Sequence, residues 1–178
     1  MTRNRSLEIK VNRRPNGCPY EGLLHFRNRT YPCLLGKGGI TTNKKEGDGA
    51  TPAGKFRLLF GYFRQERMNM PANQLSFHEI RPDDGWCDSP SSPNYNSPVK
   101  LPFSASHEIM MREDRLYNVC IVMDYNISEK RKGKGSAIFF HITSPAGKPT
   151  EGCVALSPEH MQKILPFLSS EVTMTIKP

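Results

Sequence analysis

The sequence lacks the features that mark several large classes of protein. Its 178 residues contain no apolar run close to the roughly 20 residues that a membrane-spanning helix needs, so we expect no membrane span. The five cysteines are odd in number and include no CxxC pair, which argues against a disulfide framework and against a zinc ribbon. The chain has no GxSxG and no HExxH motif, and four of its histidines do not cluster with carboxylates or thiols, so we expect no metal site and no cofactor. Those four are His25, His78, His107 and His160.

Positive charge is in excess. The chain carries 25 Lys and Arg against 17 Asp and Glu, a formal net charge of +8, which favours an anionic partner. Nucleic acid, an anionic membrane and a carboxylate-rich cell-wall polymer all fit that charge. The length is about that of one domain, enough to bury a core without disulfide or metal staples.

Short apolar runs between turn signals predict a mainly β fold. The clearest helix is expected over Ser157–Leu168, because Ser157 suits the N-cap and Pro158 the first helical position. Two long, turn-rich stretches, Gly36–Gly54 and Pro82–Pro102, are expected to be loops that wall a site. The predicted strands are Leu7–Val11, Leu23–Phe26, Tyr31–Leu35, Phe56–Phe63, Leu116–Tyr125, Ala137–Ile142 and Val172–Ile176.

One segment has the composition of a nucleophilic site. A predicted strand ends near His141, and 12 positions later Cys153 follows Gly152. A nucleophilic cysteine needs a base to take its proton and N–H donors for the oxyanion that forms after attack. His141 could be the base, and the glycine would let backbone N–H groups approach a bound carbonyl oxygen. A buried structural cysteine beside a structural histidine is the alternative interpretation.

The same segment resembles the active-site motif of the L,D-transpeptidase catalytic domain, the YkuD family, in which a histidine precedes a loop and a Ser/Thr-His-Gly-Cys sequence. Here the corresponding residues are His141 and Thr150-Glu-Gly-Cys153. An upstream block is similar to the family's GDGATPxGxF segment, and two further blocks resemble signatures of one subgroup, WCD...YN and GSAIFxH. These blocks are Gly36–Gly39 with Gly47–Phe56, Gly85–Asp88 with Tyr95-Asn96, and Gly135–His141.

The resemblance implies a fold and a reaction. The fold would be a YkuD-like β-sandwich catalytic domain with one or two packed helices, spanning residues 1–178. Cys153 would attack a peptidoglycan tetrapeptide stem, release the terminal D-alanine and form a thioester, with His141 as base and the backbone N–H groups of Gly152 and Cys153 as oxyanion donors. An amine of a second stem would then complete a cross-link. Water as the acceptor would instead give an L,D-carboxypeptidase or amidase.

The resemblance also implies a ligand set and a location. Stem peptides would be the substrate, carbapenems would form a covalent adduct with the cysteine, and the bacterial envelope or periplasm would be the site of action. The first ten residues show no export signal, since they contain no apolar run of seven or more. Residues expected to bind substrate are Thr150, Glu151, Trp86, Tyr95 and Asn96. For Trp86, Tyr95 and Asn96 the alternative is a structural role, in a loop held by a buried aromatic side chain and an Asx-type turn.

Two features depart from the family pattern or suggest another function. Glu151 stands where the family commonly has histidine, and a carboxylate beside the thiol would raise the thiol pKa unless it points away.

The rival function is a basic nucleic-acid-binding module, which would use several arginines and the 130–134 turn for phosphate contacts. No RNP-type aromatic motif or helix-turn-helix pattern accompanies that charge, so we do not expect nucleic acid as a partner. The arginines concerned are Arg3, Arg5, Arg13 and Arg14.

Overall fold

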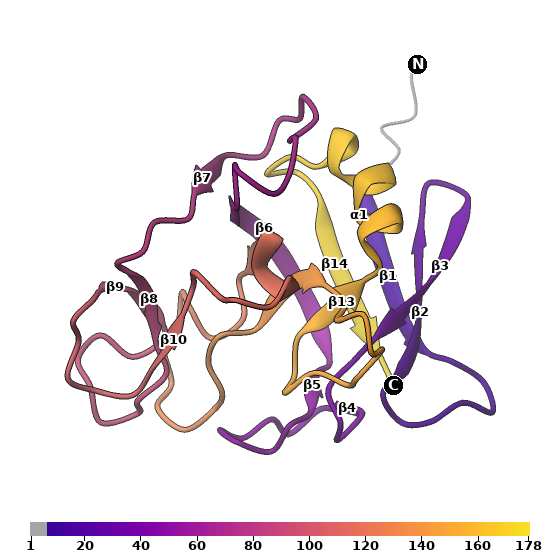
Figure 1. Cartoon of the computed structure of the whole chain (residues 1–178). Helices are drawn as coiled ribbons and strands as arrows, with labels where there is room; N and C mark the ends of the chain where they lie inside the picture. Colours follow the sequence, from indigo (N-terminus) through magenta and orange to yellow (C-terminus); the bar gives the residue numbers. More distant parts are fainter. Residues whose placement is uncertain (1–6) are drawn as a thin grey trace.

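Most of the chain forms β-strands that curl into a closed sheet (Figure 1). The computed structural model describes residues 7–178; Arg3 and Arg5 of the alternative nucleic-acid interface lie outside the described residues. The strands are β1 (Glu8–Arg13), β2 (Glu21–Phe26), β3 (Arg29–Leu34), β4 (Ile40–Thr41), β5 (Thr51–Pro52), β6 (Gly54–Phe63), β7 (Phe77–Glu79), β8 (Asp84–Cys87), β9 (Ser97–Lys100), β10 (His107–Ile109), β11 (Val119–Met123), β12 (Phe139–Ile142), β13 (Val154–Leu156) and β14 (Thr173–Lys177).

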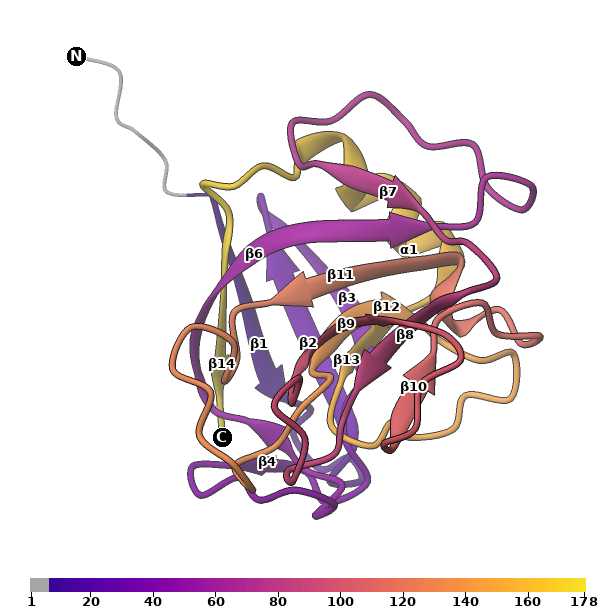
Figure 2. The ribbon, with the colours of Figure 1, turned by 90° about the vertical axis from the view of Figure 1, so that its left-hand side faces the viewer.

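The large sheet closes through its longest strand. Its order is β11-β12-β13-β3-β2-β1-β14-β6-β7, and β11 also pairs with β6. The first part of β6, up to Arg57, pairs with β14, and the part from Leu58 onward pairs with β11 (Figure 2). Pairing β11 with β6 covers the edge of β11, and within residues 7–178 the short strand β7 keeps one unpaired side.

Two hydrophobic clusters lie on opposite faces of the sheet. Every residue of β11 is buried, and alternate residues join different clusters: Val119 and Ile121 belong to the main core, whereas Cys120 and Val122 belong to the second. The second cluster is completed by a small three-stranded sheet of order β10-β8-β9, with Trp86 among its buried residues. Because strand side chains alternate, β11 supports both clusters at once.

The helical segment lies where the sequence predicts it. α1 (Pro158–Ile164) is followed by a 3₁₀ turn, η2 (Leu165–Phe167), and the Ser157 side chain accepts a hydrogen bond from the His160 N–H at 3.3 Å. Met161 and Ile164 bury the apolar face of α1 in the main core. No helix within residues 7–178 is long and apolar enough to cross a membrane.

The mainly β fold with a packed helix is confirmed, and each of the seven predicted runs overlaps a strand. Leu116–Tyr125 begins with a 3₁₀ turn, η1 (Leu116–Asn118), before β11. The predictions that Gly36–Gly54 and Pro82–Pro102 are loops are wrong in part. The first contains the two-residue strands β4 and β5, and the second contains β8 and β9. These strands are short and carry few consecutive apolar residues, so their pairing with each other defines them more than their own sequences do.

Candidate active site

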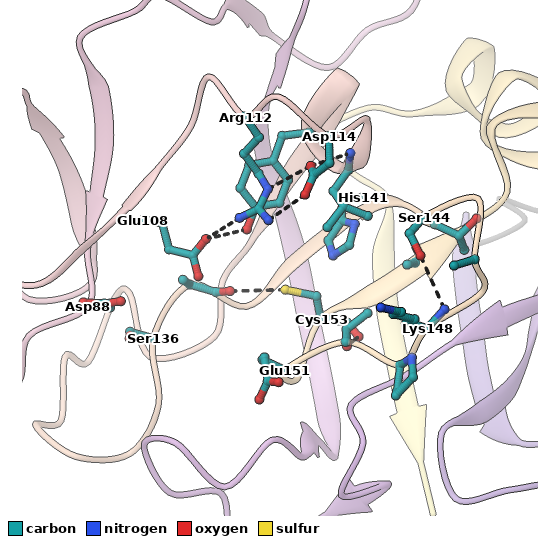
Figure 3. A pocket seen from close by; sticks show the side chains of 18 of the residues that line it. Asp88, Glu108, Arg112, Asp114, Ser136, His141, Ser144, Lys148, Glu151 and Cys153 are labelled. Atoms are coloured by element: carbon teal, nitrogen blue, oxygen red, sulfur yellow. Dashed lines mark hydrogen bonds and ion pairs between the residues drawn. The ribbon is translucent and has the colours of Figure 1, made fainter.

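A cavity of about 710 Å³ lies over the outward face of β12 and β13 (Figure 3). The two stretches expected to wall a site both contribute to it, through Lys44 and Glu46 from one and Asp88 from the other. The remaining walls come from the segment around η1 and from the loop between β12 and β13. Tertiary contacts therefore gather four separate parts of the chain around one space.

Strand register places His141 and Cys153 in this cavity. β12 and β13 are parallel, with Phe140 opposite Val154 and His141 opposite Ala155. Phe140 and Val154 belong to the main core, so His141 and Ala155 face the other way, toward the cavity. Cys153 lies two positions before Ala155 and thus shares its face. Side chains 12 positions apart in the sequence come to line the same cavity.

His141 is held as a neutral base. Its Nδ1 lies 2.8 Å from the carbonyl oxygen of Ile142, and because a carbonyl only accepts, Nδ1 carries the proton and Nε2 keeps a free lone pair. Burial, with a smaller contribution from the nearby Arg112 charge, lowers the pKa of His141 to about 4, while the Ile142 hydrogen bond and Asp114 oppose the shift. The Tyr117 ring packs edge-on against the imidazole, with centroids 5.5 Å apart.

Cys153 is a neutral thiol at rest. Burial raises its pKa to about 12, opposed by the N–H of Phe139, which donates to Sγ at 3.3 Å. The thiol in turn donates to the carbonyl oxygen of Ala137 at 3.3 Å. Among residues 7–178, no hydrogen bond joins Sγ to His141. The site therefore has no preformed thiolate–imidazolium pair.

The turn before the cysteine is tied by Thr150. Its hydroxyl donates to the carbonyl of Cys153 at 2.7 Å and accepts from the N–H of Gly152 at 3.2 Å. Gly152 has φ +136, and a Cβ there would lie 2.8 Å from the backbone oxygen of Ala50. A side chain at this position would be strained and would clash with the backbone, which explains the glycine.

The upstream glycine-rich blocks support that turn. The N–H of Lys37 donates to the carbonyl of Thr150 at 2.9 Å, and the N–H of Gly38 donates to Gly49 at 2.9 Å. A Cβ on Gly36 would come within 2.3 Å of the Gly49 oxygen, so the two blocks fit together only without a side chain there. The two sequence motifs therefore form one scaffold beneath Cys153.

Glu151 points away from the sulfur (Figure 3). Its side chain is 76% exposed and pairs with Lys37 Nζ at 2.8 Å. The charges that shift the Cys153 pKa are those of Glu108, Lys44 and Arg112, and Glu151 is not among them. An exposed pair of this kind contributes little to stability, about 0–1 kcal/mol.

Several charged side chains of the cavity carry no motif in the sequence. Arg112 binds Asp114 through two hydrogen bonds of 2.9 and 2.7 Å. Glu108 accepts from the Tyr117 hydroxyl at 2.9 Å, and burial raises the pKa of its carboxyl group. Lys44 is buried and donates to Asp48 at 2.5 Å. Of these pairs, the sequence pointed only to Lys44–Asp48, because Asp48 lies in the upstream glycine-rich block.

No group of three or more His, Cys, Asp or Glu within residues 7–178 could hold a metal ion.

Comparison with known proteins places this scaffold in a family. The model of the family described as YkuD, L,D-transpeptidase catalytic domain, matches residues 25–176. The chain belongs to this family. A search of curated proteins found no match.

Two solved structures resemble this YkuD-family chain. Bd1075 from Bdellovibrio bacteriovorus is 17% identical with a TM-score of 0.49, and the alignment covers 97% of this chain and 48% of that one. The helical cell shape determining protein Pgp2 from Campylobacter jejuni is 13% identical with a TM-score of 0.45, and the alignment covers 96% of this chain and 46% of that one. The YkuD-family chain thus spans about half the length of either structure.

Not all residues that the sequence singled out line the cavity of this YkuD-family chain. Thr150 and Glu151 do, together with the two candidate catalytic residues. Trp86, Tyr95 and Asn96 do not line it; they are 1–2% exposed and lie behind it. The Trp86 Nε1–H donates to Asn96 Oδ1 at 3.0 Å, and the Tyr95 hydroxyl donates to Glu46.

Proposed function

We propose that this chain is a cysteine-dependent L,D-transpeptidase that acts on peptidoglycan tetrapeptide stems and cross-links the cell wall. The proposal is that residues 1–178 act as a single catalytic domain, with Cys153 as nucleophile and His141 as base. One observation carries it: the register of β12 and β13 directs both side chains into the same cavity, and His141 keeps Nε2 free to accept a proton. Membership of the L,D-transpeptidase family supports the choice of reaction.

The first half-reaction forms a thioester. Cys153 Sγ attacks the carbonyl carbon at the L-centre of diaminopimelate while its proton moves to His141 Nε2. The tetrahedral intermediate collapses, the C–N bond to D-alanine breaks, and His141 returns the proton to the leaving amine. Because thiol and imidazole are both neutral at rest, attack and proton transfer are coupled.

The second half-reaction transfers the acyl group. The amine of a second stem attacks the thioester, His141 accepts a proton, and the C–S bond breaks to regenerate the thiol. The backbone N–H groups of Gly152 and Cys153 are proposed to stabilise the oxyanion in both halves, an interaction whose loss costs about 3–4 kcal/mol in acyl-transfer enzymes. The Gly152 N–H donates to the Thr150 hydroxyl at 3.2 Å in the free protein, so in this proposal it leaves that bond when the oxyanion forms.

The proposal extends to ligands and location. The net charge of +8 suits a substrate with free carboxylates, and the bacterial envelope or periplasm is the proposed place of action. Thr150 and Glu151 are at the cavity wall, where a stem peptide would lie. Carbapenems are expected to acylate Cys153, which an increase in intact mass would detect.

Product analysis tests the reaction. We incubate three proteins with a disaccharide-tetrapeptide and identify the products by mass spectrometry. The proteins are wild type, Cys153→Ala and the matched control Cys18→Ala, which changes an exposed cysteine. We expect loss of D-alanine and a cross-linked dimer with wild type and the control, and neither with Cys153→Ala. A tripeptide product without the dimer would show that water is the acceptor and that the activity is that of a carboxypeptidase. D-alanine release by Cys153→Ala would overturn the cysteine mechanism.

A further inference from the structure

The Trp86 and Asn96 side chains lie behind the active-site cavity and are hydrogen-bonded to each other. Asn96 is 1% exposed, and all four hydrogen-bonding positions of its side-chain amide are occupied. Oδ1 accepts from the Trp86 indole N–H at 3.0 Å and from the backbone N–H of Ala137 at 3.0 Å. Nδ2 donates to the carbonyls of Tyr125 and Asn126 at 3.2 and 2.8 Å. A fully satisfied buried amide fixes its neighbours in one arrangement.

The backbone that this pair holds carries both hydrogen-bond partners of the Cys153 sulfur. Ala137 provides the carbonyl that accepts the thiol proton, and Phe139 provides the N–H that donates to Sγ. Asn96 binds the Ala137 peptide directly, and the Trp86 ring packs edge-on against Phe139 with centroids 5.1 Å apart. The pair therefore contacts both residues that orient the sulfur.

The conformation of Ala137 makes this support necessary. Ala137 has φ +51, in the left-handed region that residues with a Cβ rarely adopt. It lies just before β12, so the sheet ladder does not hold it, whereas Phe139 is within the strand. The Ala137 N–H instead donates to Asn96 Oδ1, and this hydrogen bond takes the place of strand pairing at the residue whose carbonyl accepts from the thiol.

We infer that Asn96 is a positioning residue that, with Trp86 and through the Ala137 peptide, holds the Cys153 thiol protonated and in one orientation until substrate enters. This inference rests on the proposed function in taking Cys153 as the nucleophile. It explains why the WCD, YN and GSAIFxH blocks occur together in this chain, since Trp86, Asn96 and Ala137 come from those three blocks. Asn96 acts behind the cavity and does not touch the substrate.

The test measures alkylation of Cys153 by iodoacetamide across pH 6–10, by intact mass, beside kcat and KM on the disaccharide-tetrapeptide. All proteins carry Cys18→Ser, which removes the exposed thiol, so that a folded molecule gains one adduct, at Cys153. The charged or titratable groups around the sulfur are Glu108, Lys44, Arg112, His141, Tyr117 and Cys120, and the variants leave all six unchanged.

For Asn96→Ala we expect alkylation at pH 8 to rise three- to ten-fold, with its pH profile displaced to lower pH, because the carbonyl that stabilises the protonated thiol is released. We expect kcat to fall at least ten-fold, because the sulfur is no longer held in one orientation, and KM to change less than two-fold. The matched control is Asn73→Ala, which removes an amide whose side-chain hydrogen bonds within residues 7–178 go only to its own loop, to Pro71 and Leu75. It should change none of these quantities.

A second variant guards against loss of the fold. Trp86→Phe removes the indole N–H and keeps an aromatic ring against Phe139, so we expect the same changes at about half the size on a logarithmic scale. Additional adducts at the buried Cys33, Cys87 and Cys120 would show that a variant has unfolded. If Asn96→Ala unfolds, the alkylation and kcat of Trp86→Phe test the inference in its place. Alkylation and kcat equal to wild type in the folded variant would overturn the inference. Alkylation needs no peptidoglycan substrate, so it tests Asn96 even if the proposed reaction is wrong.

Discussion

Strands β12 and β13 have two faces with opposite roles. On one face Phe140, Ile142 and Val154 are at most 2% exposed and belong to the main core. On the other face His141 and Cys153 line an open cavity and make hydrogen bonds with backbone groups. Residues adjacent in sequence therefore serve packing or chemistry according to which way they point. The difference teaches that the chemistry depends on register, because a slip of one residue would exchange the two faces.

Replacing the base on the cavity face should give the largest effect. For His141→Gln we expect kcat to fall 10²–10⁴-fold, the usual contribution of a positioned acid–base group, without loss of the fold. The measurement is steady-state release of D-alanine beside a thermal unfolding curve. Activity within ten-fold of wild type would show that another group takes the proton.

The same substitution should flatten the dependence of stability on pH. His141 has its pKa lowered to about 4 in the folded protein, against about 6.5 when unfolded, so the unfolded state binds more protons between these values. Wild-type stability should therefore fall as pH drops from 7 to 4, by up to about 3 kcal/mol from this residue. Urea unfolding at several pH values measures it. Equal slopes for wild type and His141→Gln would contradict the buried, neutral state.

Replacing a side chain on the core face should reduce stability instead. Phe140→Ala removes a ring at the centre of the main core and should lower the free energy of unfolding by about 3–5 kcal/mol. Urea unfolding measures the change, and the protein that remains folded should retain its alkylation rate at Cys153. A loss below 1 kcal/mol would mean that the core tolerates the cavity.

Removing the Thr150 hydroxyl should give an intermediate effect at the boundary of the two faces. Thr150→Val keeps the shape and leaves the Gly152 N–H and the Cys153 carbonyl without their side-chain partner, so we expect about 1–3 kcal/mol lower stability and roughly ten-fold lower kcat. Thr173→Val on β14, whose hydroxyl makes no side-chain hydrogen bond within residues 7–178, is the control. Equal kcat in both variants would show that the Thr150 hydroxyl does not position the turn before Cys153.

The smallest effect is expected at Glu151. Because its carboxylate pairs with Lys37 in solvent and does not face the sulfur, Glu151→Gln should change kcat and Cys153 alkylation less than two-fold, and stability by less than about 0.5 kcal/mol. An increase in alkylation of ten-fold or more would show that this carboxylate suppresses the thiol.

Much of this organisation could be predicted from the sequence. Apolar runs located seven of the fourteen strands in residues 7–178, and the Ser157-Pro158 pair located α1, because these signals are local. The glycine-rich blocks and the two candidate catalytic residues were recognisable as motifs. The second sheet was missed, since β8 and β9 become strands by pairing with each other.

The placement of individual side chains required the tertiary structure. Trp86, Tyr95 and Asn96 were among the residues expected to bind substrate, yet they do not line the cavity. Trp86 packs in the second cluster and donates to Asn96, and the Tyr95 hydroxyl donates to Glu46. Arg112, a member of the cavity wall, sits in a polar segment without a motif. The sequence shows which residues are present, but it does not show which of their side chains line the cavity.

The sequence by itself determined the chemical groups and the local conformations: a thiol, an imidazole, and glycines where the backbone needs positive φ or close approach. Only the tertiary structure decided that the thiol and the imidazole share a face, that both are neutral at rest, and that Glu151 points away. The physical reason is that pairing across strands sets orientation, and burial sets the cost of charge; both depend on residues far apart in the chain.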